Sequence, residues 1–474
     1  MFERTDFKAA SETVCRWIDR YYSDLESFPV KSKAVPRQVY DQVPAQAPVS
    51  PDSLESILDD LDRIILPGIT HWQHPNFHAY FTANSSVESV LAEMITAAIG
   101  AQCMIWDTSP AAAELEERMM EWLRDALGLP EAFEGVIQDT ASSATLAAIL
   151  TARESKTDFR SNVDGIPANL RIYGTTQTHS SIDKAVAISG IGKRNLVRVP
   201  VDDQQRMIPM ELERCISDDL EKGYVPCCVV ATIGTTGTLA VDPVKEIAGI
   251  TSRYRIWLHV DAAYAGSALI LPEYRWMALD LEQADSFVFN PHKWLFTNFD
   301  CSAYFVRDVG SLIRTFEILP EYLKTGTRGL VNDYRDWGIP LGRRFRALKL
   351  WFVLRGYGIH GLQEKLRNQI RLNGLFAEKL ASDGSFEIVV KPFLNFTCFR
   401  YHPAGISDPD RLNGMNSRLL EAVNKSGRIF LSHTKIGEIF VIRFVFGQTY
   451  AGEQHMLTAL ETIQQTAADL FNQR

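Results

Sequence analysis

Lys293 is an unusual lysine because it lies in a largely apolar stretch, FVFNPHKWLFTNFD, that covers residues 287–300. A lysine normally keeps its ammonium group in water, whereas burial lowers its pKa and favours the neutral, nucleophilic amine. Asp261 ends another apolar run, IWLHVD. If both runs are neighbouring parallel strands, the two side chains meet beyond the strand ends, where open α/β sheets bind ligands. The simplest interpretation of the pair is a partly buried salt bridge.

Other short stretches carry residues suited to an anionic, planar ligand. VIQDTASSATLAAIL puts Thr140, Ala141 and Ser142 at the start of an alanine-rich helix, where hydroxyls and backbone N–H groups can bind a phosphate. His179 follows the strand-like run RIYGT, and its ring could stack on a flat ligand. Thr236 follows the apolar run CCVVATIG among small residues that allow a close approach. Each feature alone also has an ordinary structural explanation, as a helix cap or a structural histidine.

Together, these residues match the needs of pyridoxal 5′-phosphate (PLP). The lysine amine forms a Schiff base with the PLP aldehyde, and the aspartate pairs with the pyridine nitrogen. A helix N-terminus binds the phosphate, and a histidine ring stacks on the cofactor. The combination favours a PLP enzyme over a salt bridge that only stabilises the fold.

The elements that must position these residues alternate along the middle of the chain. Between about 70 and 310, apolar, β-rich runs are separated by helical or polar stretches, which is typical of a largely parallel sheet covered on both faces. A long helical stretch is expected over about 343–376, followed by further strand-like runs with helices between them. The expected strands lie within 171–175, 195–201, 227–234, 256–263, 286–290, 386–390, 395–402 and 438–446.

Two amphipathic helices are predicted near the N-terminus, on either side of a proline-rich spacer. Apolar residues recur at helical spacing over 10–21 and over 54–64. Two such helices cannot bury their apolar faces alone, so they should pack on the rest of the chain or on a second copy of it. The expected domains are a helical segment over 1–69, a large α/β domain over 70–365 and a small α+β domain over 366–474.

Composition excludes several other classes of protein. The 474-residue chain has a formal net charge of −9 and no run of Lys and Arg, which argues against nucleic-acid binding. No P-loop ending in GKS or GKT and no GxGxxG motif after a strand is present. The seven cysteines are irregularly spaced without a CxxC pair, so neither a disulfide framework nor a zinc site is expected. Without an apolar signal or a membrane-length apolar stretch, we expect a cytoplasmic protein with no membrane partner.

The motifs HVDAAYAGSA, NPHKWL and IPLGRRFRALKLW together resemble the group II PLP-dependent decarboxylases. The most similar branch is that of the aromatic-L-amino-acid decarboxylases of the dopa, tyrosine and tryptophan types, and the similarity covers nearly the whole chain. The resemblance implies the fold-type I, aspartate-aminotransferase-like α/β architecture. It also implies a homodimer with its active site at the subunit interface, in which the N-terminal helical segment packs across the partner subunit.

The resemblance assigns roles to individual residues. Lys293 is similar to the Schiff-base lysine, Asp261 to the partner of the pyridinium nitrogen and His179 to the ring-stacking histidine. The other positions that match the cofactor site of the family are Thr140, Ala141, Ser142, Thr236, Ala263, Asn290 and His292.

Tyr322 resembles the family's general acid, the tyrosine that protonates Cα after CO2 has left. It stands in a polar, glycine-containing stretch over 319–337 that is expected to form a lid. Relatives with phenylalanine at this position tend to become oxygen-consuming aldehyde synthases. The expected reaction is decarboxylation of an aromatic L-amino acid (dopa, tyrosine, phenylalanine, tryptophan or 5-hydroxytryptophan) to the amine. An aldehyde synthase, a decarboxylase of glutamate or cysteine sulfinate, and a binding protein without turnover remain alternatives.

Substrate-pocket positions are matched less specifically, since each aromatic residue could equally belong to the core. Thr82 replaces the usual proline of animal relatives, and Gln102 and Met104 replace an aliphatic residue and a phenylalanine. These changes predict a more polar and adaptable pocket. Arg343 could hold a substrate carboxylate or could instead stabilise the structure or the lid. The expected substrate positions are Trp72, Tyr80, Phe81, Thr82, Gln102, Met104, Phe299 and Arg343.

Overall fold

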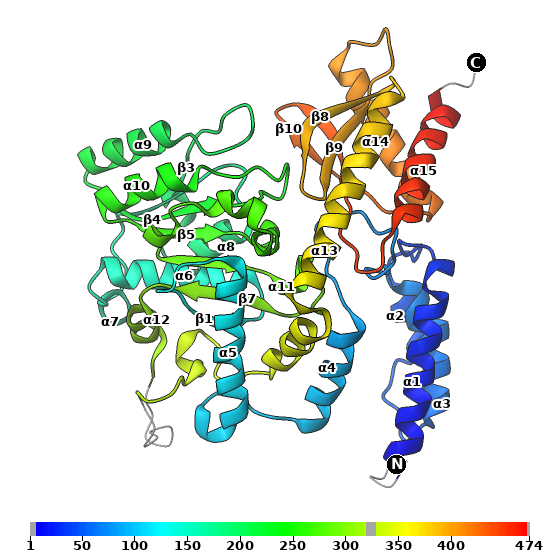
Figure 1. Ribbon diagram of the computed structural model, residues 1–474, viewed down its shortest axis with the longest axis horizontal. Coiled ribbons are helices and arrows are strands. Elements are labelled where there is room, and N and C mark those ends of the chain that lie inside the picture. Colours follow the sequence, from blue (N-terminus) through cyan, green and yellow to red (C-terminus); the bar gives the residue numbers. More distant parts are fainter. Residues whose placement is uncertain (1–5, 319–328, 472–474) are drawn as a thin grey trace. The chain divides into compact units, whose positions relative to one another are not determined.

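The computed structural model describes residues 6–318 and 329–471. The chain divides into two compact units, one of Met1–Thr82 with Arg371–Arg474 and one of Ala83–Ile370 (Figure 1). The larger unit covers most of the range expected for the α/β domain. The smaller unit joins the N-terminal segment to the C-terminal region, which the sequence analysis treated as separate domains.

A seven-stranded sheet forms the centre of the larger unit, with the strand order β1-β7-β6-β5-β4-β2-β3. Strand β7 runs antiparallel to both of its neighbours, and the other pairings are parallel. Strand β4 is buried along almost its whole length, as expected for a strand covered on both faces. The strands are β1 (Glu134–Gln138), β2 (Leu170–Gly174), β3 (Leu196–Arg198), β4 (Val225–Thr232), β5 (Trp257–Asp261), β6 (Ser286–Phe289) and β7 (Ser302–Val306).

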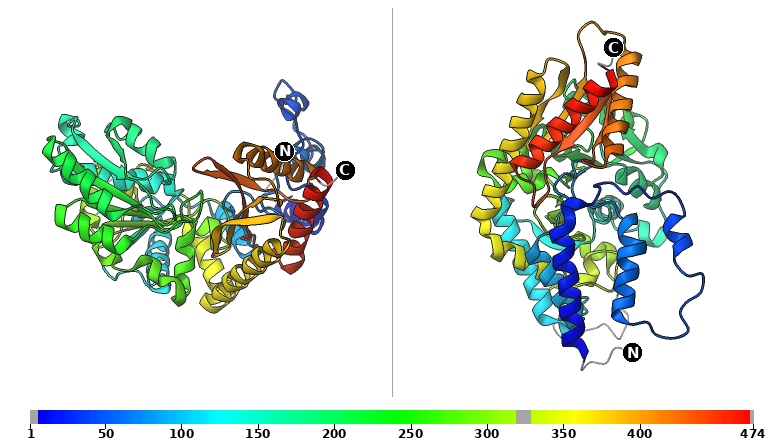
Figure 2. Two further views of the ribbon diagram at one scale, coloured as in Figure 1. Left: turned by 90° about the horizontal axis from the view of Figure 1, so that it is seen from above. Right: turned by 90° about the vertical axis from the view of Figure 1, so that its right-hand side faces the viewer.

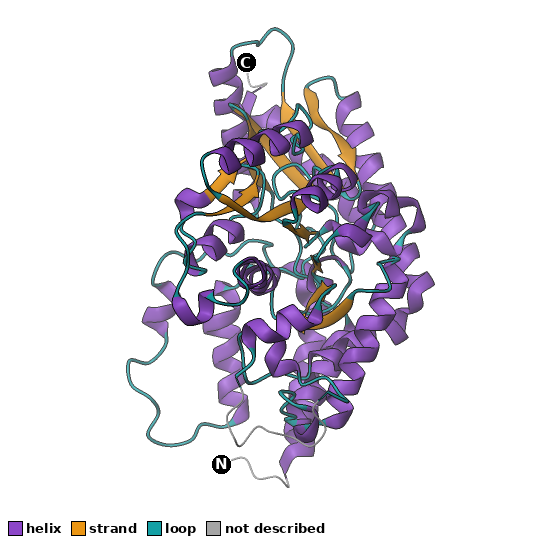
Figure 3. Ribbon diagram, turned by 90° about the vertical axis from the view of Figure 1, so that its left-hand side faces the viewer, coloured by secondary structure: helices purple, strands orange, loops and turns teal. Residues whose placement is uncertain are grey.

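Helices cover both faces of this sheet, and Figure 3 shows its strands enclosed by them. In Figure 1, α9 (Pro209–Glu221) and α10 (Val244–Tyr254) lie on one face, and α6 (Ala141–Lys156) and α8 (Ser181–Ile188) lie on the other. The remaining helices that lie wholly in this unit are α4 (Val87–Ile99), α5 (Pro110–Leu127), α7 (Ser161–Asp164), α11 (Pro291–Trp294) and α12 (Val309–Phe316).

Helix α6 lies close to the sheet because its inner face is made of small residues. Ala144, Ala147 and Ala148 are buried against Val288 of β6 and Tyr304 of β7. Alanine combines the highest helix propensity with the smallest side chain, so the helix can approach the strands without leaving a void. This packing fixes the position of the first turn of α6, which carries the predicted phosphate-binding residues.

The expected long helix is present as α13 (Arg346–Ser382), with an interruption at Gly358. Gly358 has φ 64° and ψ 165°, a backbone conformation that glycine adopts readily and other residues rarely do. The interruption divides α13 into two helical parts. Among the helices of the described residues, none has the length and hydropathy needed to span a membrane.

The smaller unit contains a four-stranded sheet in the order β10-β11-β9-β8, with every pairing antiparallel. Figure 2 shows two helices and the last part of α13 beside this sheet. Its core is rich in aromatic residues, and the rings of Phe376 and Phe444 stack at 3.8 Å. The strands and helices of this sheet are β8 (Phe386–Phe393), β9 (Phe396–Tyr401), α14 (Pro409–Ser426), β10 (Ser432–Ile436), β11 (Ile439–Val445) and α15 (Glu453–Phe471).

Both predicted N-terminal helices are present, as α1 (Phe7–Asp24) and α3 (Leu54–Asp60), with the short α2 (Gln38–Gln42) between them. Helix α1 contacts the helical turn that follows α3, Leu61–Ile65, since the Trp17 indole N–H donates to Asp62 at 2.8 Å. Neither α1 nor α3 has a fully buried residue within the chain. Their apolar faces are therefore only partly covered within the chain.

Candidate active site

The predicted lysine and aspartate meet at the carboxyl edge of the large sheet. Asp261 is the last residue of β5, and Lys293 lies in α11, directly after β6. The two strands are paired, with Asp261 opposite Val288, and the Asn290 N–H donates to the Ala263 carbonyl at 3.0 Å. Burial lowers the pKa of Lys293, and the Asp261 carboxylate opposes this shift. The unusual sequence context of this lysine therefore reflects a largely buried amine beside a carboxylate.

The main chain of Lys293 is held on both sides. Its N–H donates to the Asn290 carbonyl at 2.9 Å, and its carbonyl accepts from the Asn84 amide at 2.6 Å. Asn84 also donates its backbone N–H to the His292 carbonyl at 3.0 Å. Pro291 at the start of α11 fixes the local φ, which favours the helical turn that presents the lysine.

The next residue, Trp294, anchors this turn in the core. Its ring is fully buried and stacks on Tyr264 at 5.3 Å with an interplanar angle of 6°. Its indole N–H donates to the Gln369 side chain at 2.7 Å. A buried indole needs such a partner, because an unpaired donor in the core is costly. The lysine is thus presented by a turn that cannot shift without disturbing the core.

His292 is buried and its ring is oriented by the main chain of Cys301. The Cys301 N–H donates to Nδ1 at 2.9 Å, so the proton of the neutral ring is on Nε2. Burial, together with the charge of Lys293, lowers the pKa of His292 to about 3. His292 therefore stays neutral at physiological pH and offers one N–H donor. The neighbouring Asn290 is also fixed, since its Oδ1 accepts from the Ser302 hydroxyl at 2.5 Å.

Asp261 is fixed by its own strand end. Its Oδ1 accepts from the Ala263 N–H at 3.0 Å, and its carbonyl accepts from the Ile233 N–H at 2.9 Å. The side chain is only 5% exposed. A carboxylate held in this way is a suitable partner for a protonated ring nitrogen, because it needs no reorganisation to accept a hydrogen bond.

His179 lies after β2 with an exposed side chain. Its Nδ1 accepts from the Ser181 N–H at 3.2 Å, so the proton of the neutral ring is again on Nε2. Partial burial lowers the pKa of His179, the charge of Asp261 opposes this shift and that of Lys293 adds to it. The three side chains therefore act on one another electrostatically, as the sequence analysis expected of residues at one site.

Thr140 is confirmed as the N-cap of α6, a helix of 16 residues, and Ala141 and Ser142 form its first turn. The Thr140 hydroxyl accepts weakly from the Ser143 N–H at 3.4 Å. Thr236 is exposed on the turn that follows β4. Hydroxyls and a helix N-terminus at the edge that carries the lysine fit an anionic group such as a phosphate. The donor set thus fits PLP, with a largely buried amine, a carboxylate, a neutral imidazole N–H and an anion site.

Arg343 is committed to the fold of the larger unit. Its guanidinium pairs with the Glu116 carboxylate at 2.5 Å and donates to the Ile137 carbonyl at 2.9 Å. It also lies over the Tyr334 ring, 4.9 Å from the ring centre. Of the two alternatives for Arg343, these contacts favour a structural role over binding of a substrate carboxylate.

The other substrate positions of the larger unit are near its surface. Gln102 is exposed, and its Oε1 accepts from the Arg343 N–H at 2.7 Å. Met104 is half-buried and its carbonyl accepts from the Arg335 N–H at 2.9 Å. Phe299 is 59% exposed, and its ring lies 4.7 Å from that of His292, one of the residues predicted to bind the cofactor.

The remaining substrate positions belong to the smaller unit. Trp72 and Tyr80 are partly exposed, and their rings stack at 5.8 Å. Phe81 is buried, and Thr82 is fully buried with its hydroxyl donating to the Gly447 carbonyl at 3.4 Å. Tyr322 lies outside the described residues.

Sequence reasoning missed the residues that support the lysine turn. The Asn84 side chain donates to the Lys293 carbonyl, and the main-chain N–H of Cys301 donates to the His292 ring. Both contacts support the turn without taking part in catalysis. No motif of the sequence analysis included Asn84, so nothing indicated this contact.

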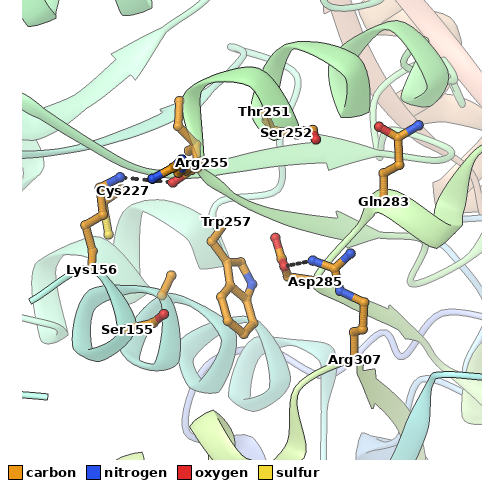
Figure 4. Close-up of a pocket in the computed structure, with 12 residues that line it drawn as sticks. Ser155, Lys156, Cys227, Thr251, Ser252, Arg255, Trp257, Gln283, Asp285 and Arg307 are labelled. Carbon is orange, nitrogen blue, oxygen red and sulfur yellow. Dashed lines mark hydrogen bonds and ion pairs between the residues drawn. The ribbon is translucent and has the colours of Figure 1, made fainter. Parts of the chain in front are cut away.

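A separate cavity of about 490 Å³ lies at the amino-terminal edge of the same sheet (Figure 4). Its charged groups are engaged by the protein itself. Lys156 donates to the Arg255 carbonyl at 3.0 Å, and Asp285 forms an ion pair with Arg307. None of the predicted site residues lines this cavity.

Comparison with known proteins identifies the family of this chain and its fold. The sequence model of the pyridoxal-dependent decarboxylase conserved domain matches residues 36–402. Tyrosine decarboxylase 2 of Narcissus pseudonarcissus is 43% identical over 96% of this chain and 92% of that protein. Phenylacetaldehyde synthase of Arabidopsis thaliana is 42% identical over 96% and 94%, respectively. The crystal structure of Oryza sativa TDC with PLP and tryptamine has a TM-score of 0.96 at 35% identity and covers 99% of each chain, which confirms the expected fold.

Proposed function

Because the chain belongs to the pyridoxal-dependent decarboxylase family, we propose that it decarboxylates an aromatic L-amino acid to the amine and CO2. The chain is a PLP-dependent carboxy-lyase. The observation that carries the proposal is the buried Lys293, whose pKa is lowered beside Asp261 at the ligand-binding edge of the sheet. An aromatic substrate is supported by the similarity to tyrosine and tryptophan decarboxylases over nearly the whole chain.

In this proposal, each side chain at the sheet edge binds or orients a different part of the cofactor. With the cofactor bound, Lys293 would hold its aldehyde, Asp261 would pair with its protonated ring nitrogen, and His179 would pack on its ring. When bound, PLP supplies the electron sink for the electron pair of the broken bond. The remaining proposed contacts, to the phosphate, the ring and the lysine, are Thr140, Ala141, Ser142, Thr236, Ala263, Asn290 and His292.

Tyr322 is the proposed general acid that returns a proton to Cα. A positioned general acid contributes typically ~10²–10⁴-fold to a rate. If Tyr322 delivers this proton before oxygen reacts at the carbon, the amine is the product. The phenylacetaldehyde synthase relative makes an aldehyde synthase the second candidate function.

A homodimer is part of the same proposal. The exposed face of α4 carries Val87, Leu91, Ile95 and Ile99, which recur every four residues and are 42–59% exposed. Helix α1 is amphipathic, yet none of its residues is fully buried within the chain. An exposed apolar stripe such as that of α4 marks a protein–protein interface, and a second copy of the chain would cover it and the partly covered face of α1. The seven cysteines are free, which supports a reducing, cytoplasmic location.

The proposal is tested by trapping and by products. Borohydride reduction of the PLP-loaded enzyme followed by digestion should leave the pyridoxyl tag on the peptide that contains Lys293. A panel of free amino acids should then yield CO2 and amine in equal amounts from an aromatic member. A tag on another peptide would refute the lysine assignment, whereas stoichiometric hydrogen peroxide and aldehyde would identify the second candidate.

A further inference from the structure

Asp300 is held by a buried arginine of α13. The Arg346 guanidinium contacts both carboxylate oxygens, with Nε to Oδ1 at 2.9 Å and Nη2 to Oδ2 at 3.3 Å. The two side chains are only 14% and 18% exposed. Burial alone would raise the pKa of Asp300, but the Arg346 guanidinium outweighs it and lowers that pKa. Two-point contact between planar groups fixes orientation as well as distance.

Lys349, one turn further along α13, adds a second buried charge near the same segment. Its side chain has no exposed surface, and burial lowers its pKa to about 8. Its Nζ lies 3.2 Å from the Glu93 carboxylate of α4, and the charge of Asp300 opposes the lowering of its pKa. Two positively charged side chains at the start of α13, those of Arg346 and Lys349, therefore lie near residues 300–301.

Cys301, the residue after Asp300, binds His292 twice. The His292 N–H donates to the Cys301 carbonyl at 3.2 Å, and the Cys301 N–H donates to His292 Nδ1 at 2.9 Å. The second bond sets which ring nitrogen carries the proton. Any shift of residues 300–301 would therefore move the imidazole, its tautomer or both, directly beside Lys293.

We propose that Arg346 is a positioning residue for the cofactor site, acting through Asp300 and Cys301 to hold His292 with its proton on Nε2. The inference rests on the proposed function, because it takes His292 and Lys293 as cofactor-binding residues. Arg346 itself does not need to touch the cofactor. Its loss leaves the largely buried Asp300 carboxylate without its two-point partner, which is costly and draws the segment toward water.

The test compares Arg346→Met and Arg346→Lys with the wild type. The apoenzyme is titrated with PLP, and binding is followed by the visible absorbance of the lysine-bound cofactor and by its pH dependence. We expect PLP affinity to fall about tenfold or more in Arg346→Met, which corresponds to a loss of about 1.4 kcal/mol. The midpoint of the pH-dependent absorbance change should also shift, and Arg346→Lys should recover part of both effects.

The matched control is Arg367→Met on the same helix. Arg367 also makes a two-point contact with a carboxylate, Glu273, but this pair is about half exposed. Its loss should leave PLP affinity within about twofold, because exposed pairs contribute little. Ile463→Val in the core of the smaller unit serves as a second control, since it lowers stability without touching the site.

A double-variant cycle tests the route through Asp300. If Arg346 acts through this carboxylate, Asp300→Asn alone should weaken PLP binding, and Asp300→Asn with Arg346→Met should lose no more than the worse single variant. Additive losses, or normal PLP affinity in an Arg346→Met protein that is only less heat-stable, would overturn the inference. Because borohydride trapping at Lys293 in the wild type is independent of these variants, failure of the proposed function would be recognised separately.

Discussion

At the scale of single residues, the site depends on how a lysine side chain is kept partly out of water. Lys293 sits on a short turn whose main chain is bonded to Asn84 and Asn290 and whose next residue, Trp294, is locked in the core. Burial and the Asp261 carboxylate act on its pKa in opposite directions. The amine thus remains close to a carboxylate while part of its population can be neutral and nucleophilic.

Replacing this amine should separate binding from turnover. We expect Lys293→Ala to retain PLP through the phosphate and ring contacts but to lose the covalent link, with kcat falling roughly 10³-fold or more. Absorbance spectra and CO2 release measure the two effects. Lys156→Ala is the matched control, because Lys156 is also a partly buried lysine of the larger unit with a lowered pKa. Normal turnover in Lys293→Ala would contradict the assignment.

A second residue-scale prediction concerns the general acid. Tyr322→Phe should slow protonation of Cα and shift the product from amine toward aldehyde with hydrogen peroxide. The ratio of amine to aldehyde, measured by chromatography alongside oxygen uptake, checks this expectation. Tyr40→Phe, a change at an exposed tyrosine of the smaller unit, should leave the ratio unchanged. An unaltered amine yield in Tyr322→Phe would remove this tyrosine from the mechanism.

At the scale of elements, the large sheet brings the predicted site residues to one edge, and no single motif contains them all. The carboxyl ends of β1, β2, β4, β5 and β6 lead directly into the predicted residues. The strands that carry or precede these residues were predictable, because most of them are nearly continuous apolar runs. They are the strands at Lys293, Asp261, His179 and Thr236.

Other elements were not predictable for physical reasons. Strand β10 was missed because its burial alternates along a polar sequence, SHTKI, and no apolar run marks it. Strands β1 and β7 were missed because each adjoins a stretch that was interpreted for its chemistry, the turn at Thr140 after β1 and the stretch 287–300 before β7. The contact between Arg346 and Asp300 joins residues 46 positions apart, and nothing in their spacing indicates it.

One element-scale prediction concerns the uncovered face of α4. Leu91→Glu should place a charge in the centre of the proposed dimer interface and shift the protein toward monomers, with loss of activity. Sedimentation velocity over a concentration series measures the change. Met210→Glu alters an isolated exposed apolar residue of α9, which is 80% exposed, and should leave the assembly intact. A wild type that sediments as a monomer at all concentrations would refute the proposed interface.

At the scale of the whole molecule, the smaller unit joins both ends of the chain in one fold. Sequence periodicity predicted the N-terminal helices but not their association with the C-terminal region. Periodicity reports only local structure, and these segments are far apart in the sequence. Histidines of the N-terminal segment illustrate it. His78 is buried between Phe444 and Phe446, with ring centres at 4.6 and 5.7 Å, and its Nδ1 lies 3.2 Å from the Val445 carbonyl.

These histidines predict sensitivity of the fold to acid. Burial lowers the pKa of His78 to about 3 and of His74 to about 4, so the folded state binds fewer protons than the unfolded state below pH ~6.5. Stability is therefore full above that pH and falls as pH drops toward the folded-state values. The slope is at most roughly 1.4 kcal/mol per pH unit for each histidine.

Thermal unfolding between pH 7.5 and 5 should therefore show a falling Tm, with a shallower fall in His78→Phe. The phenylalanine keeps the ring packing but cannot bind a proton. His433→Phe, a change at an exposed histidine of the same unit, should show the wild-type slope. Equal slopes in the wild type and His78→Phe would show that His78 contributes nothing to the acid response.

Strand β7 has a consequence for which molecules the site can accept. It lies between β1, which leads to the helix cap at Thr140, and β6, which leads to Lys293. Two interstrand steps of about 4.8 Å therefore separate the strand that leads to the proposed phosphate site from the strand that leads to Lys293. We expect a vitamer without its phosphate to contact only the Lys293 end of the site.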